Sequence, residues 1–174
     1  KKLKVKKVGH LGTLDPLAKG LVILAINRAT KFSSYFLESD KSYDVQIKLG
    51  IATDTDDSTG TIIHESQNYP ERESVKKELL SFIGESMQVP PFFSALKHKG
   101  KPLYKYAREG NFISKPSRRI FISKIENFNY TNKICSFTVD CSKGTYIRSI
   151  ARDIGNKLDC GAHMTSLTRI SQGN

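Results

Sequence analysis

The chain of 174 residues carries 28 lysines and arginines against 17 acidic residues, a net charge of +11. This length suits one domain, with or without an insertion, and such a domain buries enough surface to need no disulfide or metal support. The longest apolar run, Leu21–Ile26, is far too short to cross a membrane. Three cysteines are an odd number for a disulfide framework and suit a reducing compartment, so we expect a cytoplasmic protein.

The positive charge is concentrated in two segments. Residues 1–7 carry five lysines and no acid, while residues 97–119 carry eight basic residues against Glu109 alone. The rest of the chain sums to −1, so these two segments hold all of the excess charge. Tyr104 and Tyr106 are interleaved with the basic residues of the second segment, which favours a nucleic-acid partner there. For residues 1–7, a solvated surface segment explains the charge equally well.

The first half of the chain predicts short elements on either side of one well-marked strand. In chain order, the expected elements are a loop at Gly9–Gly20, a buried run at Leu21–Ile26, a short helix at Ala29–Leu37, a strand at Tyr43–Leu49, an acidic loop at Asp54–Gly60, a short strand at Thr61–His64 and a helix with apolar residues from Val75 to Ile83 that stops at Gly84. Polar and apolar residues alternate cleanly in the 43–49 strand. Tyr43 is therefore expected to point into the protein together with Val45 and Ile47.

The second half predicts three strands and two helices after a break at Pro90-Pro91. The expected elements are a helix at Pro102–Arg108 followed by Gly110, strands at Ile120–Ile125 and Cys135–Cys141, a helix with an apolar stripe from Ile147 to Leu158, and a strand near His163–Ile170. Helices and turns separate the strands irregularly, without the repeating strand–helix order of a parallel sheet. The sequence therefore predicts an α+β fold with a mixed, mostly antiparallel sheet flanked by helices.

The stretch Gly9–Ala18 is the most unusual in the chain, because it combines two glycines and a proline with a single carboxylate. Asp15 precedes Pro16, which pushes the backbone of Asp15 toward an extended conformation. Glycines permit tight turns and close approach of a ligand, so such a loop can aim the Asp15 carboxylate into a cleft. An aspartate that merely opens a turn is the ordinary alternative. Phosphate binding is disfavoured, because the glycine patterns of phosphate-binding loops are absent.

This stretch resembles the signature of the TruB family of tRNA pseudouridine synthases. Further blocks resemble that family in the same order along the chain: Lys41-Ser42-Tyr43, Thr53-Asp54-Thr55-Asp56, Gln88-Val89-Pro90-Pro91, Ser94-Ala95-Leu96-Lys97, Tyr106-Ala107-Arg108-Glu109-Gly110, Cys141-Ser142-Lys143-Gly144-Thr145-Tyr146-Ile147-Arg148, and Gly161-Ala162-His163 with Leu167. The matches run from Gly9 to about Ile170. Each block alone is weak, but the ordered set is very specific.

The resemblance implies a pseudouridine synthase fold and an enzyme that isomerises uridine to pseudouridine in the TΨC loop of tRNA, at position 55. The reaction breaks the N-glycosidic bond, rotates the base and rejoins it through carbon, after the base has been flipped out of the folded RNA. By resemblance, Asp15 is the nucleophile, and Arg148 is the partner that orients it. Tyr43 is the aromatic surface on which the uracil stacks and a candidate to relay its proton. Whether Asp15 attacks the uracil ring or the sugar carbon stays open.

The resemblance also implies residues that bind the RNA. His10, Tyr146 and Leu167 match family positions that contact the flipped nucleotide or its neighbours, although by themselves His10 and Leu167 would be interpreted as a turn histidine and a core leucine. Residues 88–119 are expected to form a basic RNA-contacting insertion within a catalytic domain that spans 1–174. Its expected RNA-binding residues are Lys97, Lys99, Lys101 and Arg108. The implied partner is tRNA, and we expect a monomer without a cofactor, a metal, a protein partner or a membrane.

Two patterns imitate metal sites. Residues 54–65 resemble a calcium loop, but the glycine that such a loop requires falls at the seventh position instead of the sixth. Cys160 and His163 form half of a zinc pattern, with no second half at suitable spacing. We expect both patterns to be structural. Compared with the family, the chain is expected to lack an N-terminal strand and a C-terminal RNA-binding domain.

Two other functions stay open on the sequence alone. One is an RNA-binding or RNA-folding protein whose chemistry is lost, and the other is a relative that depends on a guide RNA. The joint presence of Asp15, Tyr43 and Arg148 favours the enzyme.

Overall fold

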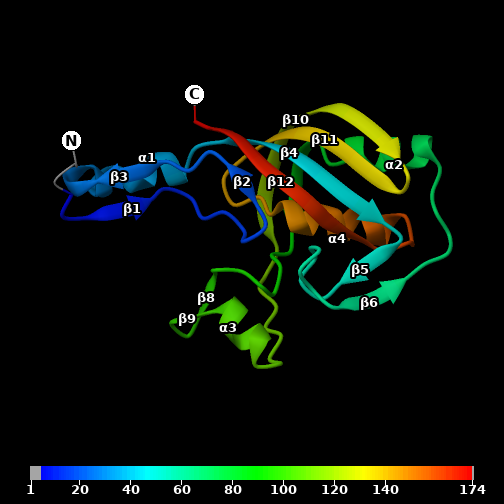
Figure 1. Cartoon of the computed structure of the whole chain (residues 1–174), viewed down its shortest axis with the longest axis horizontal. Helices are drawn as coiled ribbons and strands as arrows, with labels where there is room; N and C mark the ends of the chain where they lie inside the picture. Colours follow the sequence, from blue (N-terminus) through cyan, green and yellow to red (C-terminus); the bar gives the residue numbers. More distant parts are fainter. Residues whose placement is uncertain (1–4, 174) are drawn as a thin grey trace.

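One curved sheet of six strands organises the computed structural model, which describes residues 5–173 (Figure 1). The strands of the chain are β1 (Val8–His10), β2 (Lys19–Gly20), β3 (Leu24–Ile26), β4 (Lys41–Leu49), β5 (Ile51–Thr53), β6 (Ile62–Glu65), β7 (Gly84–Gln88), β8 (Lys97–His98), β9 (Lys101–Pro102), β10 (Arg118–Thr131), β11 (Ile134–Cys141) and β12 (Ala162–Gln172). The helices are the 3-10 helix η1 (Asn27–Phe32), α1 (Ser33–Leu37), α2 (Arg72–Leu80), α3 (Leu103–Arg108) and α4 (Ile147–Lys157). Of the basic segment 1–7, Lys1, Lys2 and Lys4 lie outside the described residues.

The order of strands in the sheet is β2-β12-β4-β11-β10-β7. Only the short pairing of β2 with β12 is parallel, and the other neighbours run antiparallel. Two-residue alternation explains the central strand, because Tyr43, Val45, Ile47 and Leu49 are all buried on one face of β4. The predicted α+β class with a mixed, mostly antiparallel sheet is confirmed.

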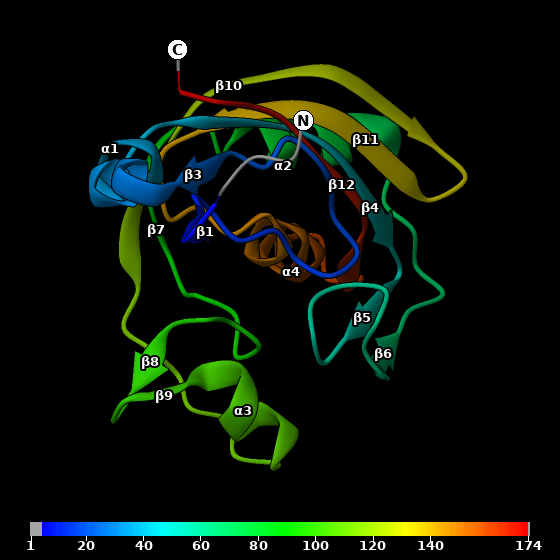
Figure 2. The ribbon, with the colours of Figure 1, turned by 60° about the vertical axis from the view of Figure 1, so that its left-hand side comes forward.

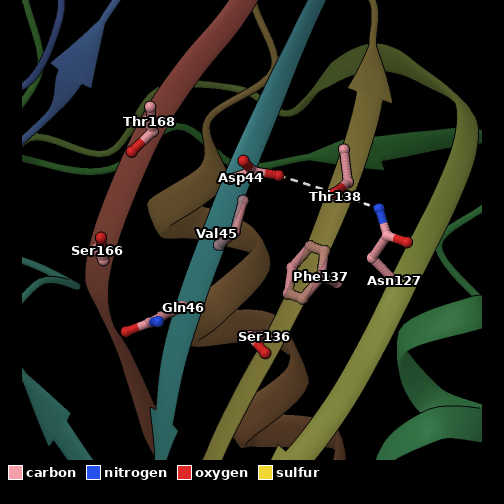
Figure 3. A pocket seen from close by; sticks show the side chains of 9 residues that line it. All are labelled: Asp44, Val45, Gln46, Asn127, Ser136, Phe137, Thr138, Ser166 and Thr168. Carbon is pink, nitrogen blue, oxygen red and sulfur yellow. Dashed lines mark hydrogen bonds between the residues drawn. The ribbon is translucent and has the colours of Figure 1, made fainter.

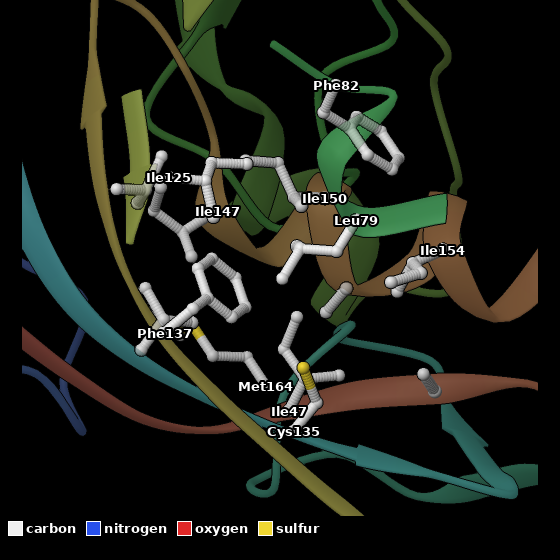
Figure 4. Packing of buried hydrophobic residues seen from close by; sticks show 14 of the residues in the cluster. Ile47, Leu79, Phe82, Ile125, Cys135, Phe137, Ile147, Ile150, Ile154 and Met164 are labelled. Carbon is white, nitrogen blue, oxygen red and sulfur yellow. The ribbon is translucent and has the colours of Figure 1, made fainter. Parts of the chain in front are cut away.

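The core lies between one face of the sheet and the helices α2 and α4 (Figure 4). Ile150 and Ile154 of α4 and Leu79 of α2 have no exposed surface. Each such side chain stabilises the fold by about 1.5–3 kcal/mol through its removal from water. None of the helices in residues 5–173 is long and apolar enough to cross a membrane.

The opposite face of the sheet is polar and carries a shallow cavity of about 380 Å³ (Figure 3). Here the side-chain amide of Asn127 donates to the Thr138 hydroxyl, which in turn donates to the Asp44 carboxylate, across three neighbouring strands. The helix α4 passes behind the sheet in this view. The two faces of the sheet therefore differ sharply in character, as expected for antiparallel strands that alternate in polarity.

Two expectations from the sequence were wrong in detail. The run Leu21–Ile26 is not buried: among its members Ala25 alone is buried, and Leu24 is 58% exposed. Its last three residues form β3, which pairs with β1 in a separate two-stranded sheet outside the main one. The helix predicted to reach Ile83 ends at Leu80, because the following residues turn to place Gly84 at the start of β7. Gly84 adopts a left-handed φ of +105°, which an ordinary side chain disfavours.

Residues 89–117 leave the sheet and return to it between two paired strands. Gln88 at the end of β7 lies opposite Arg118 at the start of β10. The chain between them, which we call the basic excursion, contains the β8–β9 hairpin and α3 and stands away from the sheet (Figure 2). At its base, the ring of Phe112 packs edge-on against those of Phe92 and Phe93. The excursion is thus attached at one edge of the sheet, on the side of α4.

Candidate active site

A cavity of about 880 Å³ opens on the helix-bearing side of the sheet. The parts of the chain that line it include the loop around Asp15, the strand β4 with Tyr43, the turn 55–59, the strand β12 with Arg169, and the start of α4 with Tyr146 and Arg148. The basic excursion adds Arg108 to the lining. The cavity is therefore assembled from segments that are far apart in sequence.

Arg148 holds the carboxylate of Asp15 with two parallel hydrogen bonds. Its Nε donates to Oδ2 and its Nη2 donates to Oδ1 of Asp15, both over 2.8 Å. Arg148 is 5% exposed, whereas the side chain of Asp15 is 28% exposed. Such a fork fixes the orientation of the carboxylate as well as its charge. One side of Asp15 thus faces its partner while the other stays open to the cavity.

Arg148 is itself held by three further groups. Its Nη1 donates to the carbonyl oxygen of Thr55 and its Nη2 to that of Phe93. The buried carboxylate of Asp57 lies 3.8 Å from its Nε. Asp57 is fixed in turn, because its Oδ1 accepts hydrogen bonds from the hydroxyls of Thr55 and Thr59 and from the Thr59 amide. The guanidinium therefore sits between two carboxylates and has little freedom to move.

Sequence reasoning missed Asp57. Its neighbours Asp54 and Asp56 belong to a block that resembles the family, but the adjoining acid does not. The available signal was the density of carboxylates in the turn, and one sequence does not show which of them points inward. In the structure, Asp56 instead pairs with Arg152 at 3.2 Å, and burial raises the pKa of Asp56 to about 6 against the opposing effect of Arg152.

Two glycines allow the loop of residues 9–20, which we call the Asp15 loop, to approach β12. Gly12 has a φ of +115° and Gly20 a φ of +98°. A Cβ at Gly20 would collide with the carbonyl oxygen of Arg169, so no other residue fits there without movement. Between them, the Ala18 amide donates to the Asp15 carbonyl and closes a turn through Pro16. The local turn and the contact with β12 together place Asp15 at the cavity.

Tyr43 is 8% exposed and lines the cavity from the central strand. The prediction that its ring points into the protein is confirmed. Its pKa is raised by burial and further by Cys141, whereas the guanidinium of Arg169 lowers it. Tyr146 also has a raised pKa, owing first to burial. The buried Gln88 amide accepts from the backbone amide of Tyr146 and donates to its carbonyl, which ties the start of α4 to β7.

The structure brings together only some of the residues predicted to bind substrate. Tyr146 and Arg108 line the cavity with Asp15. His10 is exposed on β1 and does not line it, and Leu167 is buried in the core opposite Val45. The roles predicted for these residues stay predictions.

The predicted RNA-binding lysines fall into two environments. Lys97 and Lys99 are exposed in and beside the β8–β9 hairpin. Lys101 is less exposed, and its ammonium contacts both carboxylate oxygens of Glu109, at 2.5 and 2.6 Å. It also lies over the ring of Tyr106. Lys97 and Lys99 are therefore more available to a polyanion than Lys101.

The two patterns that imitate metal sites are occupied by contacts within the protein. The Asp54 carboxylate accepts from the Thr61 amide, and the Nδ1 of His163 lies 2.7 Å from the carbonyl oxygen of Ile51. In residues 5–173, no group of three or more His, Cys, Asp or Glu side chains is placed to hold a metal ion.

The geometry places one oriented carboxylate and one buried phenol on the same cavity, an arrangement that suits covalent or electrostatic catalysis. Asp15 can act as a nucleophile or stabilise positive charge that develops on a substrate. The cavity is large enough for a flipped base, and the aromatic faces of Tyr43 and Tyr146 offer stacking surfaces.

Comparisons with known proteins place the chain among pseudouridine synthases. Residues 1–147 match the model of the TruB family pseudouridylate synthase (N terminal domain). The chain is 49% identical to tRNA pseudouridine synthase B of Blochmanniella floridana, over 97% of this chain and 66% of that protein. It is 51% identical to the protein of the same name from Mesoplasma florum, over 100% of this chain and 62% of that protein. The chain thus spans less than two thirds of the length of these relatives.

Solved structures show the same fold. A Cbf5-Nop10-Gar1 complex contains a chain that is 27% identical, with a TM-score of 0.72 over 98% of this chain and 41% of that chain. An H/ACA RNP bound to a substrate RNA contains another, with a TM-score of 0.68 and 24% identity over 97% of this chain and 39% of that chain, and it supports the fold alone. The chain belongs to the TruB family of pseudouridylate synthases.

Proposed function

We propose that this chain converts uridine to pseudouridine in the TΨC loop of tRNA, at position 55. The observation that carries the proposal is the Asp15 carboxylate, gripped by Arg148 on one side and open to an 880 Å³ cavity on the other. Family membership and the name shared by the relatives, tRNA pseudouridine synthase B, support the same reaction and substrate.

In this proposal the target uridine is flipped out of the RNA into the cavity, because its glycosidic bond is inaccessible within folded RNA. The uracil stacks on Tyr43, and Asp15 acts on the glycosidic bond or on the ring. The bond between nitrogen and the sugar breaks, the base rotates, and a carbon–carbon bond forms in its place. The proton lost from that carbon leaves through Tyr43, and the freed ring nitrogen takes up a proton.

The basic excursion would hold the surrounding RNA. Its exposed Lys97 and Lys99 suit contacts with phosphates, which bind the RNA backbone without regard to sequence. Arg108 lines the cavity and stacks over the ring of Tyr104, so it suits a contact nearer the flipped nucleotide. The tRNA is thus bound at two levels, one outside and one at the mouth of the cavity.

The decisive experiment is to incubate the chain with unmodified tRNA transcripts and to map pseudouridine at single-nucleotide resolution. We expect modification at position 55 with wild type and none with Asp15→Asn. The matched control is Asp56→Asn, which removes a neighbouring acid that pairs with Arg152 away from Asp15. RNA binding without any pseudouridine in wild type would instead indicate an RNA-binding protein that has lost its chemistry.

A further inference from the structure

Arg169 on β12 is the largest side chain in residues 5–173 that is almost completely inaccessible to solvent, at 1% exposure. A buried charge is costly unless it is paired or fully hydrogen-bonded. Yet within the described part of the chain Arg169 forms no salt bridge with a carboxylate. What this arginine contacts therefore indicates why the fold retains it.

Its contacts are backbone carbonyls on both sides of Asp15. The Nη2 of Arg169 donates to the Gly12 carbonyl over 3.0 Å, and its Nε donates to the Leu21 carbonyl over 2.7 Å. The backbone adds a further contact, because the Leu21 amide donates to the Arg169 carbonyl. One planar guanidinium thus joins Gly12, within the Asp15 loop, to Leu21, the residue that follows the loop.

A second group nearby strengthens this attachment. The amide nitrogen of Gln172, also on β12, donates to the Leu11 carbonyl over 2.6 Å. The Asp15 loop is thereby held to β12 through side chains as well as through the short pairing of β2. Without these side chains, the loop between Gly12 and Leu21 would be held by its internal turn, by the hydrogen bonds from Arg148 to Asp15 and by the short backbone pairing with β12.

Arg169 also faces Tyr43. The two residues are directly opposite each other in the pairing of β12 with β4, and both line the cavity. The groups that influence the Tyr43 hydroxyl are Cys141 on β11, Asp15 on its loop and Arg169, and only Arg169 lowers the pKa of the phenol against its burial. Lys41, which precedes Tyr43 by two residues, also lines the cavity, but its ammonium donates to the carbonyls of Leu37 and Ser39.

We propose that Arg169 is a positioning residue that holds the Asp15 loop by its two carbonyls and supplies the positive charge beside the Tyr43 hydroxyl. This one side chain would fix the position of the nucleophile Asp15 relative to the phenol of Tyr43, which relays the proton. Arg148 orients the Asp15 carboxylate directly, whereas Arg169 acts on the backbone that carries it. The catalytic part of this inference rests on the function proposed above.

The two roles separate in two variants. Arg169→Lys keeps a charge beside Tyr43 but loses the planar fork that reaches both carbonyls. Methionine in Arg169→Met is an unbranched chain that loses both the charge and the hydrogen-bond donors. The matched controls are Arg72→Lys and Arg72→Met. Arg72 begins α2, away from the cavity, and it also donates to a backbone carbonyl, that of Tyr130 on β10.

The first measurement is the single-turnover rate, followed as tritium released from carbon 5 of uridine in tRNA, together with tRNA affinity and thermal unfolding. We expect Arg169→Lys to lose about a hundredfold in rate, as for a catalytic group displaced by about an ångström, with affinity unchanged. The Arg72 variants should retain the wild-type rate. A folded Arg169→Lys protein with a near-normal rate would overturn the loop-holding role.

The second measurement needs no activity. Tyrosine labelled with carbon-13 at Cζ reports the titration of each phenol, and the Tyr43 signal is assigned by its loss in Tyr43→Phe. The pKa of Tyr43 should rise in Arg169→Met and stay close to wild type in Arg169→Lys. An unchanged value in Arg169→Met, or an equal rise in both variants, would overturn the electrostatic role.

The two measurements also keep this inference distinct from the proposed function. If wild type released no tritium from any tRNA, the proposed function would fail, while the Tyr43 titration would still decide the electrostatic role of Arg169. If Arg169→Met did not fold, Arg169→Gln would replace it in the titration with the same expected rise.

Discussion

The cavity at Asp15 and the basic excursion hold their charged side chains in different ways. At the cavity, Arg148 makes four hydrogen bonds, two of them to the Asp15 carboxylate. In the excursion, Lys97 and Lys99 are exposed on a hairpin whose strands have two residues each. In the function proposed above, the chemistry is assigned to side chains that their neighbours hold in place, and binding of a long polyanion is assigned to side chains that are free to adapt.

The largest expected effect is that of Asp15→Asn, which removes the anion at the centre of the cavity. The amide has nearly the same size but cannot act as an anionic nucleophile, so pseudouridine formation should fall by about 10⁴-fold or more. Affinity for tRNA should stay close to wild type, because that affinity is assigned to the excursion. Appreciable turnover by the variant would show that the chemistry of the cavity does not depend on Asp15.

Tyr43→Phe should lose about 10²- to 10⁴-fold in turnover while keeping most of the affinity, because the stacking plane remains and only the hydroxyl is lost. Tyr43→Ala should lose both. Single-turnover rates and tRNA binding, measured on the same preparations, separate these effects. A normal rate for the phenylalanine variant would leave Tyr43 as a stacking surface, and the proton would have to leave by another route.

Arg148→Lys should lower the single-turnover rate by about 10²- to 10³-fold although the formal charge is retained. Lysine cannot donate two parallel hydrogen bonds to Asp15 and also reach the carbonyls of Thr55 and Phe93. Circular dichroism checks the fold, and tRNA affinity should change little because the interaction is internal. Arg152→Lys, one helical turn further along α4, is the matched control and should have a far smaller effect.

Asp57→Asn tests whether the second carboxylate on Arg148 matters. The Asp57 carboxylate lies 3.8 Å from the guanidinium of Arg148 without forming a hydrogen bond to it. We therefore expect its replacement to lower the rate by only about tenfold, equivalent to about 1.4 kcal/mol. Asp56→Asn provides the adjacent control. Equal effects of the two substitutions on the rate would show that the turn acts through general stability and not through Arg148.

The smallest effect on catalysis should come from the excursion. Neutralising Lys97 and Lys99 should weaken tRNA binding. The slope of log affinity against log salt concentration should become shallower by about 0.7 to 0.9 for each phosphate that is no longer neutralised. Neutralising Lys101 should do less, since Glu109 already binds its ammonium. The rate at saturating tRNA should be unchanged. A lower saturated rate with an unaltered salt slope would show that the excursion acts on the chemistry instead.

Local patterns in the sequence determined several features of this protein. Two-residue alternation along β4 predicted the buried face that carries Tyr43. The position of Asp15 before Pro16, between two glycines, predicted a loop that can aim the carboxylate into a cleft, and Asp15 does line the cavity. The ordered family blocks then supplied the partnership of Asp15 with Arg148. These inferences succeeded because strand alternation and turn chemistry depend on residues a few positions apart.

Only the tertiary structure decided the features that depend on packing between distant segments. Leu21–Ile26 looks buried by composition, yet its last three residues form β3 of a small separate sheet, and most of its apolar side chains remain exposed. Asp57 lies near the guanidinium of Arg148, and Arg169 donates to the backbone carbonyls of Gly12 and Leu21. These contacts join segments that are far apart in the chain, and one sequence does not show which distant segments meet. Lys101 differs from Lys97 and Lys99 because a short helix returns Glu109 to it. Alternation of polar and apolar residues specifies which face of a strand a side chain lies on. Its contacts depend on which distant segments pack against that face, and only the tertiary structure specifies these.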